Sequence, residues 1–379
     1  MTETAERQAL ESYRSRVRGS LLGGAIGDAL GGPVEFWDLP RIRAVCGPDG
    51  VRSYQPATVD GVPGHGWITD DTQMTLFTVE GIIRASVRTD RGLGFTVAVL
   101  QHAYDRWLDT QQLDGPDGTR DGWLIGQRWL YSRRAPGTTC LQALETARDG
   151  HRSISPFGRP AVNGSKGCGG VMRSAPFGLV WPGAGYPLDW TFDAAAEAAG
   201  FTHGHVTGRL ASGALASLVG ALVRGRSLAE AVEDTLGLLE RRDGHQETSR
   251  AIVRAVEAAR HPADAAVVES LGAGWIAEEA LAVGLYAALA HPEPGEVLDA
   301  LALAVTHSGD SDSTGSICGN LLGALHGETA LPPELVFEVE GRGTILTLAD
   351  DLCTEFTVGR ELHGDYGPFT RWTTRYPGW

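Results

Sequence analysis

Two short stretches of the sequence gather oxygen-bearing side chains closely enough to bind cations. The first is ITDDT, and the second is SGDSDSTG, which opens an apolar, glycine-rich segment. Their candidate ligands are Thr69, Asp70 and Asp71 in the first stretch and Asp310, Asp312 and Ser313 in the second. Carboxylate and hydroxyl oxygens are hard ligands that suit Mg²⁺ or Mn²⁺ rather than zinc. If the two stretches meet, we expect them to hold two Mg²⁺ ions about 3.5–4 Å apart, with Mn²⁺ as the alternative.

The same residues have a simpler interpretation as helix caps. Threonine and aspartate at a helix start accept backbone N–H bonds and oppose the helix dipole. Capping accounts well for ITDDT taken by itself. It accounts less well for the second stretch, because one cap does not require both Asp310 and Asp312. The adjacent Asp70 and Asp71 point in different directions, so each can face a different partner.

Three further segments place polar groups beside glycines. The segment GDALGGPVEF carries Asp28 and Glu35, and THGHVTG carries His203 and His205. The loop SKGCGGVMR contains Lys166, Gly167, Cys168, Gly169 and Gly170. This loop has neither the GxxxxGK[ST] order of a P-loop nor GxGxxG spacing, although backbone N–H groups exposed in it can bind phosphate oxygens. A plain turn explains the loop equally well, and a hydrogen-bonded packing role explains His203.

The spacing of apolar residues predicts a mostly helical chain. Apolar residues recur at helical spacing from Leu10 to Leu21 and lead into a glycine-rich segment that Pro33 should end near residues 31–32. Because glycine costs about 1 kcal/mol per residue in a helix, its repetition there indicates close approach of another backbone. A second helix should begin at ITDDT, and residues 110–137 should form a polar, mobile loop. Later helices are expected at 190–200, 206–225, 228–242, 247–260, 275–290 and 295–307.

Composition limits the classes of protein to which the chain can belong. Hydrophobic residues make up 42% of it, and neither a repeat nor a linker divides it, so one all-α domain over residues 1–379 is expected. The net charge of −15, without a basic cluster, argues against binding to duplex nucleic acid. Five scattered cysteines without a CxxC pair argue against a disulfide framework or zinc knuckle. The charged N-terminal segment and the absence of a run of about 18 apolar residues predict a cytoplasmic protein with no membrane partner. A monomer is expected.

In their order along the chain, these features resemble the ADP-ribosylglycohydrolase family, which includes dinitrogenase reductase activating glycohydrolase and the ADP-ribosylarginine hydrolases. The segments that carry the resemblance are GAIGDALGGPVEF, TDDTQM, NGSKGCGGVMRSAPFG, THGHVTG, GWIAEEALAVGLYAAL and HSGDSDSTGSICGN. They extend roughly from Val17 to Gly327. The resemblance implies a single compact orthogonal helical bundle with a binuclear metal cleft. It also implies that ADP-ribose and ADP-ribosylated proteins or small molecules are the binding partners.

The resemblance further implies roles for individual residues. Both acidic stretches supply the metal ligands, and Glu35, Asp70 and Asp312 are the expected catalytic carboxylates. The segment Lys166–Gly170 holds the diphosphate of ADP-ribose, and His203 lies near the substrate. The hydroxyl residue after the last aspartate is threonine in several members of the family and serine in this chain, as in the arginine-specific branch. Many bacterial members have proline where this chain has Val206.

The expected activity is therefore metal-dependent hydrolysis that releases ADP-ribose, with the N-glycosidic bond to arginine as the preferred linkage. Other ADP-ribose linkages remain as alternatives, including those to serine, to an acetyl group and to nucleic acid. A non-enzymatic binder is a further alternative, although such members lose metal ligands and this chain keeps every expected one. An immunity protein against an ADP-ribosylating toxin is the last. Such immunity proteins tend to carry extra N-terminal segments, and only about 16 residues precede the first motif here, which argues against this alternative.

Overall fold

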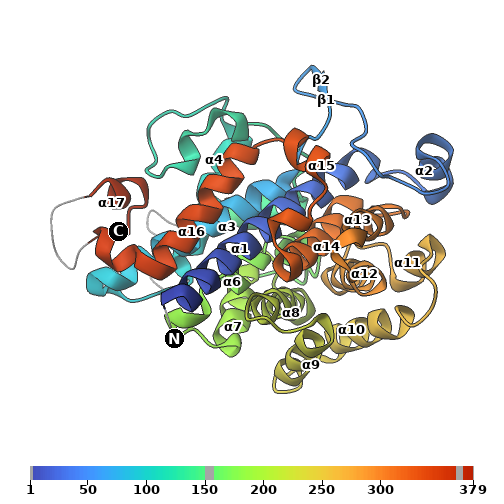
Figure 1. Ribbon diagram of the computed structural model, residues 1–379. Helices are drawn as coiled ribbons and strands as arrows, with labels where there is room; N and C mark the ends of the chain where they lie inside the picture. The colour runs from blue at the N-terminus through green and yellow to red at the C-terminus, as the bar shows by residue number, and fades with distance from the viewer. Residues whose placement is uncertain (1–2, 150–157, 364–369, 379) are drawn as a thin grey trace.

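The computed structural model describes residues 3–149, 158–363 and 370–378. Within these residues the protein consists of α-helices and short helical turns, with one small hairpin (Figure 1). The α-helices are α1 (Glu3–Gly31), α2 (Leu39–Cys46), α3 (Asp70–Arg88), α4 (Ala98–Gln112), α5 (Thr138–Asp149), α6 (Ala175–Gly178), α7 (Leu188–Ala199), α8 (Val206–Val223), α9 (Leu228–Leu239), α10 (Gln246–Ala258), α11 (Ala265–Leu271), α12 (Ala277–Ala290), α13 (Val297–Val305), α14 (Ser311–His326), α15 (Pro333–Glu338), α16 (Arg342–His363) and α17 (Arg371–Arg375). The all-α fold class is confirmed.

Shorter elements connect these helices. The single-turn elements are η1 (Gly32–Val34), η2 (Thr89–Leu93), η3 (Leu124–Gly126), η4 (Arg128–Leu130), η5 (Cys168–Gly170), η6 (Pro182–Ala184), η7 (Pro294–Glu296) and η8 (Glu328–Ala330). The strands β1 (Ala57–Val59) and β2 (Val62–Gly64) form an antiparallel hairpin in which Ala57 lies opposite Gly64. This hairpin lies in the glycine- and proline-rich segment that precedes α3.

Most helices predicted from the sequence are present. The six predicted between residues 190 and 307 correspond to α7, α8, α9, α10, α12 and α13, with ends within three residues of the predicted bounds. Two expectations need correction. The segment 265–271 forms α11, which was not predicted. The segment 110–137 begins inside α4, and its apolar side chains Leu124 and Leu130 are completely buried, so it packs against the core as an ordered connection.

The centre of the fold is a pair of antiparallel helices, α1 and α14, whose backbones are in contact (Figure 1). Glycines face each other at three levels along the pair, namely Gly19 with Gly323, Gly23 with Gly319 and Gly27 with Gly315. A methyl group added at Gly27 would lie 2.0 Å from the carbonyl oxygen of Gly315, far inside van der Waals contact. The glycine repetition in the sequence therefore does mark close backbone approach. This packing brings the C-terminal end of α1 beside the N-terminal end of α14.

Other helices surround this pair and complete the core. Helices α12 and α13 pack on α14, while α3 and α16 pack on α1 and on each other. Helix α8 packs against α7 and α9 and also contacts α14. It is long and apolar enough to cross a membrane by length and composition, but 89% of it is buried inside the protein. Packing within the core therefore accounts for its apolar composition.

Candidate metal centre and substrate cleft

The two acidic stretches predicted to meet do lie in one cleft. Helix α1 leads through η1 to Glu35, α3 begins at Asp70, and α14 begins just after Asp310. The cleft has a volume of about 510 Å³. Its acidic and hydroxyl-bearing wall consists of Glu35, Asp70, Asp71, Asp310, Asp312 and Ser313. Three helix ends thus supply this wall. The contact between α1 and α14 brings two of them together, and α3 packs against α1.

The carboxylates of the cleft are close together and are not neutralised by basic side chains. Glu35, Asp310 and Asp312 offer oxygen atoms that all lie within 4.8 Å of one another. Within the described part of the chain, neither lysine nor arginine lines the cleft. Burial, together with the negative charge of Asp312, raises the pKa of Glu35 to about 10 and that of Asp310 well above its ordinary value.

A divalent cation fits this arrangement better than protons or water alone. Besides the crowded carboxylates, Asp71 has a buried oxygen, Oδ1, with no hydrogen-bond partner among the described residues. A buried carboxylate oxygen without a partner is costly, and a cation would satisfy it. The donor atoms that face the cleft from the acidic wall are carboxylate and hydroxyl oxygens, which are the ligands that Mg²⁺ and Mn²⁺ prefer.

Asp28 fixes the start of α3 without lining the cleft. Its carboxylate accepts hydrogen bonds from the backbone N–H of Thr69 at 2.9 Å and of Thr72 at 3.0 Å, and from the Thr72 hydroxyl. Burial, followed by the charge of Asp312, raises the pKa of Asp28 to about 7. This residue, on α1, therefore holds the turn that orients Asp70 and Asp71.

The capping interpretation holds for one residue of each stretch. Thr69 is the N-cap of α3, and its hydroxyl accepts the N–H of Asp71 at 3.3 Å. Asp310 is the N-cap of α14, and its carboxylate accepts the N–H of Ser313 at 3.4 Å. Asp310 also lines the cleft, whereas Thr69 is not among the cleft-lining residues.

The glycine-rich loop forms another part of the cleft wall and contacts one of the carboxylates. Gly167, Cys168 and Gly169 line the cleft, and the Cys168 thiol lies 2.7 Å from Oδ2 of Asp310. A methyl group on Gly169 would lie 2.8 Å from the sulfur of Cys140, so the loop has no room for a side chain there. Gly170 lies behind this surface, where a methyl group would meet Ala199 at 3.1 Å.

Lys166, expected in the diphosphate site, is instead engaged away from the cleft. Its ammonium group lies 2.8 Å from a carboxylate oxygen of Glu247 and is also paired with Glu278. Its carbonyl accepts the N–H of Ala277, which fastens the loop to the start of α12. The structure thus places this lysine as an anchor of the loop.

His203 lies beside the loop and is nearly completely buried, with 2% of its surface exposed. Its Nδ1 is hydrogen-bonded to the Thr202 hydroxyl at 2.8 Å. Burial, reinforced by the positive charge of Arg173, lowers the pKa of His203 to about 3, so the ring is neutral. His205, in the same motif, caps α8 by accepting the N–H of Thr207 at 3.1 Å.

Two aromatic side chains at the cleft were missed by the sequence analysis. Phe36 and Trp275 stack with ring centroids 5.7 Å apart and an angle of 25° between the ring planes. Both line the cleft and both are exposed, Phe36 to 74% and Trp275 to 42%. In the sequence, the feature that could have pointed to Phe36 is its position directly after Glu35. Their partnership depends on contact between segments that lie more than 200 residues apart.

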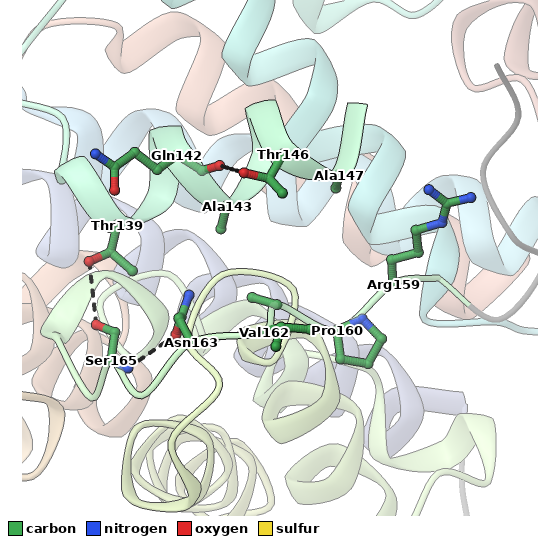
Figure 2. Close-up of a pocket in the computed structure, with 11 residues that line it drawn as sticks. Thr139, Gln142, Ala143, Thr146, Ala147, Arg159, Pro160, Val162, Asn163 and Ser165 are labelled. Carbon is green, nitrogen blue, oxygen red and sulfur yellow. Dashed lines mark hydrogen bonds between the residues drawn. The ribbon is translucent and has the colours of Figure 1, made fainter. Parts of the chain in front are cut away.

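A second hollow of about 440 Å³ adjoins the cleft. Figure 2 shows it between α5, which supplies Thr139, Gln142 and Thr146, and the segment that leads to Ser165. The hydroxyls of Thr139 and Ser165 lie 3.3 Å apart. Thr139 lines both the hollow and the cleft, so the two spaces share a border.

Comparison with known proteins identifies the family. The sequence pattern of the ADP-ribosylglycohydrolase family matches residues 9–361. The chain belongs to the ADP-ribosylglycohydrolase family. Among curated proteins, an uncharacterized protein of Archaeoglobus fulgidus is 28% identical over 82% of this chain and 87% of its own length. The ADP-ribosyl-[dinitrogen reductase] glycohydrolase of Rhodospirillum rubrum is 24% identical over 85% of this chain and 89% of its own length.

The fold agrees with this assignment. A solved structure described as an ADP-ribosylglycohydrolase-related protein complex superposes with a TM-score of 0.65 at 24% identity, covering 92% of this chain and all of that one. As an ADP-ribosylglycohydrolase, the protein is a hydrolase of ADP-ribosylated substrates. The family is in general metal-dependent, and the acidic groups of the cleft could bind metal.

Proposed function

We propose that this protein releases ADP-ribose from arginine by hydrolysing the bond between C1″ of the distal ribose and the guanidinium nitrogen, with two Mg²⁺ ions in the cleft. The observation that carries the proposal is the convergence of Glu35, Asp310 and Asp312 beside Ser313. The ligands would be Thr69, Asp70, Asp71, Asp310, Asp312 and Ser313. Bound cations would orient the ribose hydroxyls and make a nearby water more acidic.

The chain's own residues would perform the remaining steps. Such bonds break through a transition state with oxocarbenium character. The pKa of Glu35 is raised in the absence of cations, and their positive charge would favour its carboxylate form. As the oxygen of water bonds to C1″ and the C1″–N bond breaks, this carboxylate would accept a proton from that water. Glu35 then releases this proton and the leaving nitrogen takes up one proton in its place, so one water is consumed and free ADP-ribose and arginine are the products. Asp70 and Asp312, also on the acidic wall, hold the ribose in place for this attack.

The glycine loop would hold the diphosphate through close approach and through Gly169. The N–H groups of Gly167 and Cys168 are already donated to the Ser165 hydroxyl and to the carbonyl of Trp275. The contribution of the loop to phosphate binding would therefore fall to the backbone of Gly169, which a side chain would displace by pressing on Cys140. The stacked rings of Phe36 and Trp275 would border the substrate at the mouth of the cleft.

The linkage is the part of the proposal that an assay decides. The purified protein is incubated with arginine-linked, serine-linked and O-acetyl-ADP-ribose, with and without MgCl₂, and released ADP-ribose is measured. We expect the fastest release from the arginine linkage, and only with metal, because Ser313 resembles the arginine-specific branch. Faster release from serine or from the acetyl ester would overturn the proposed linkage while leaving the family activity intact. We also propose that the protein acts as a cytoplasmic monomer.

A further inference from the structure

A second cluster of ligand-type side chains lies outside the cleft. Asp90 belongs to η2, while Glu355 and His363 belong to α16. Each offers one nitrogen or oxygen, and these three atoms lie within 4.8 Å of one another. The side chains of Glu355 and His363 are completely buried, and that of Asp90 is 22% exposed. None of the three lines the substrate cleft.

The distances between the nitrogen and oxygen atoms of this cluster fit ligands of one metal ion better than they fit a hydrogen-bonded histidine. Nε2 of His363 lies 3.4 Å from Oδ2 of Asp90 and 3.3 Å from Oε1 of Glu355. Among the described residues, neither ring nitrogen of His363 has a hydrogen-bond partner, and neither does Oε1 of Glu355. With metal–ligand bonds of about 2.1 Å, two ligand atoms of a tetrahedral site lie about 3.4 Å apart. A protonated histidine would instead direct its N–H at one oxygen, about 2.7–2.9 Å away.

Neighbouring residues hold Glu355 in the orientation that the cluster needs. The indole N–H of Trp372, in α17, donates to Oε2 of Glu355 at 2.7 Å and leaves Oε1 to face the histidine. Gly359 lies one turn along α16 between the two ligands. A methyl group there would lie 2.8 Å from Oε2 of Glu355, so the glycine leaves the space in which the carboxylate lies. A hydrogen bond that orients a ligating carboxylate in this way is typical of metal sites.

We propose that Asp90, Glu355 and His363 form a structural site for a transition-metal ion of the zinc type. One imidazole nitrogen with two carboxylate oxygens suits zinc better than Mg²⁺, so this site differs in chemistry from the cleft. The ion would join the end of α16 to the turn that follows α3. Through Trp372 it would also fasten α17. Its role is stability, and the proposal is independent of the proposed hydrolysis.

The test uses the full-length protein, stripped of metal with EDTA and dialysed. Zinc chloride is titrated by calorimetry with excess MgCl₂ present to occupy the cleft, and melting temperatures are recorded with and without zinc. The variants are His363→Gln, Asp90→Asn and Trp372→Phe. His65→Gln is the matched control, because His65 pairs with Glu338 at 3.4 Å on the exposed surface.

We expect the wild type and His65→Gln to bind one more zinc ion than His363→Gln and to melt at a higher temperature when zinc is added. Asp90→Asn removes a ligand and should weaken zinc binding more than about 100-fold, whereas Trp372→Phe should weaken it about 10- to 100-fold, the usual effect of losing a group that orients a ligand. Release of ADP-ribose in MgCl₂ should be unchanged in all four variants.

Equal zinc stoichiometry and equal zinc-induced stabilisation in the wild type and Asp90→Asn would overturn the proposal, even if His363→Gln does not fold. The cluster would then be an ion pair between a protonated histidine and two carboxylates. A pH titration separates the two cases further, because zinc requires the neutral imidazole and its binding should weaken as the pH falls.

Discussion

Buried carboxylates occur in two settings in this protein, and the settings differ in what neutralises them. Glu80, in α3, is completely buried, and its oxygen Oε2 lies 3.3 Å from the guanidinium of Arg106, which is itself only 4% exposed. Its other oxygen accepts the N–H of Leu124 at 2.8 Å. In the cleft, Glu35, Asp310 and Asp312 crowd together, and among the described residues they have no such basic partner. Helix α3 carries acids in both settings, because Glu80 lies in the core whereas Asp70 and Asp71, at the start of the helix, line the cleft.

We interpret the paired acid in the core as a contribution to stability and the unpaired acids in the cleft as a contribution to the proposed function. A buried acid with its own arginine contributes to the fold because each charge depends on the other. A buried acid without one costs stability until a cation arrives. We therefore expect substitutions at the two places to have opposite consequences, and the following experiments test this from the largest expected effect to the smallest.

Asp312→Asn should reduce ADP-ribose release by at least about 100-fold, because the change removes one negative charge from the proposed site of two dications. Asparagine is isosteric, so the fold should survive. Without metal the melting temperature should rise slightly, because one source of repulsion disappears. Single-turnover assays and thermal melts with and without MgCl₂ measure both effects. Wild-type turnover together with the wild-type stabilisation by Mg²⁺ would show that Asp312 is not a ligand.

Glu80→Gln should have the opposite profile. It leaves the buried guanidinium of Arg106 without its counter-charge, which typically costs about 3–5 kcal/mol. Urea unfolding measures this loss, and Glu247→Gln, at a pair that is far more exposed, serves as the control. Activity per folded molecule should stay close to that of the wild type. A stability loss no larger than that of the control would remove the contrast between the two settings.

The metal-free protein should become less stable as the pH rises. The pKa of Glu35 is about 10 in the folded protein against an ordinary value of 4.5, so the folded state retains a proton that the unfolded state releases. The corresponding stability is fully present below about pH 4.5 and is lost progressively towards pH 10. Melting temperatures measured between pH 5 and 8 in EDTA should fall more steeply in the wild type than in Glu35→Gln. Added MgCl₂ should weaken this dependence.

Gly169→Val tests the part of the cleft wall that the glycine-rich loop forms. A side chain there would press on Cys140 and displace the loop backbone that is proposed to hold the diphosphate. We expect the KM for the substrate to rise about tenfold or more, while the stabilisation by Mg²⁺ stays at its wild-type value. Calorimetry with ADP-ribose provides the direct measurement. Unchanged affinity would remove the loop from the binding site.

Lys166→Met should have the smallest effect on catalysis. Its ammonium group is paired with Glu247 and Glu278 and does not line the cleft, so we expect KM to change less than about threefold. The pair with Glu247 is partly exposed, and pairs of this kind contribute about 1 kcal/mol or less to stability. A large rise in KM with unchanged melting temperature would restore this lysine to the diphosphate site.

Much of the fold was accessible from the sequence because local signals specify it. Apolar spacing predicts the helices from α7 to α13 apart from α11, whose seven residues are too few for a clear period. The repeated glycines of α1 predict a close neighbour, but they do not say which helix supplies it. That neighbour, α14, is identified only by matching glycines almost 300 residues later.

The parts that escaped sequence analysis depend on direction and on long-range contact. Lys166 lies in the glycine-rich loop, yet its side chain turns towards acids on α10 and α12, and a local motif does not encode that choice. The stack of Phe36 on Trp275 and the cluster around His363 join residues that are far apart in the chain. Neither has a spacing rule that a single sequence reveals.

The contact between α1 and α14 also has a consequence for how the protein is made. Glu35 leaves the ribosome early, whereas Asp310 and Asp312 emerge only after most of the chain has been synthesised. Contacts between such distant segments form late, because the entropy cost of closing a long loop comes before the contacts can stabilise the fold. Because facing glycines bring the backbones of α1 and α14 into contact at three levels, the two helices cannot pack in this way when α14 is only partly docked. We therefore expect the nascent protein to remain without a metal site, and hence inactive, until α14 docks against α1.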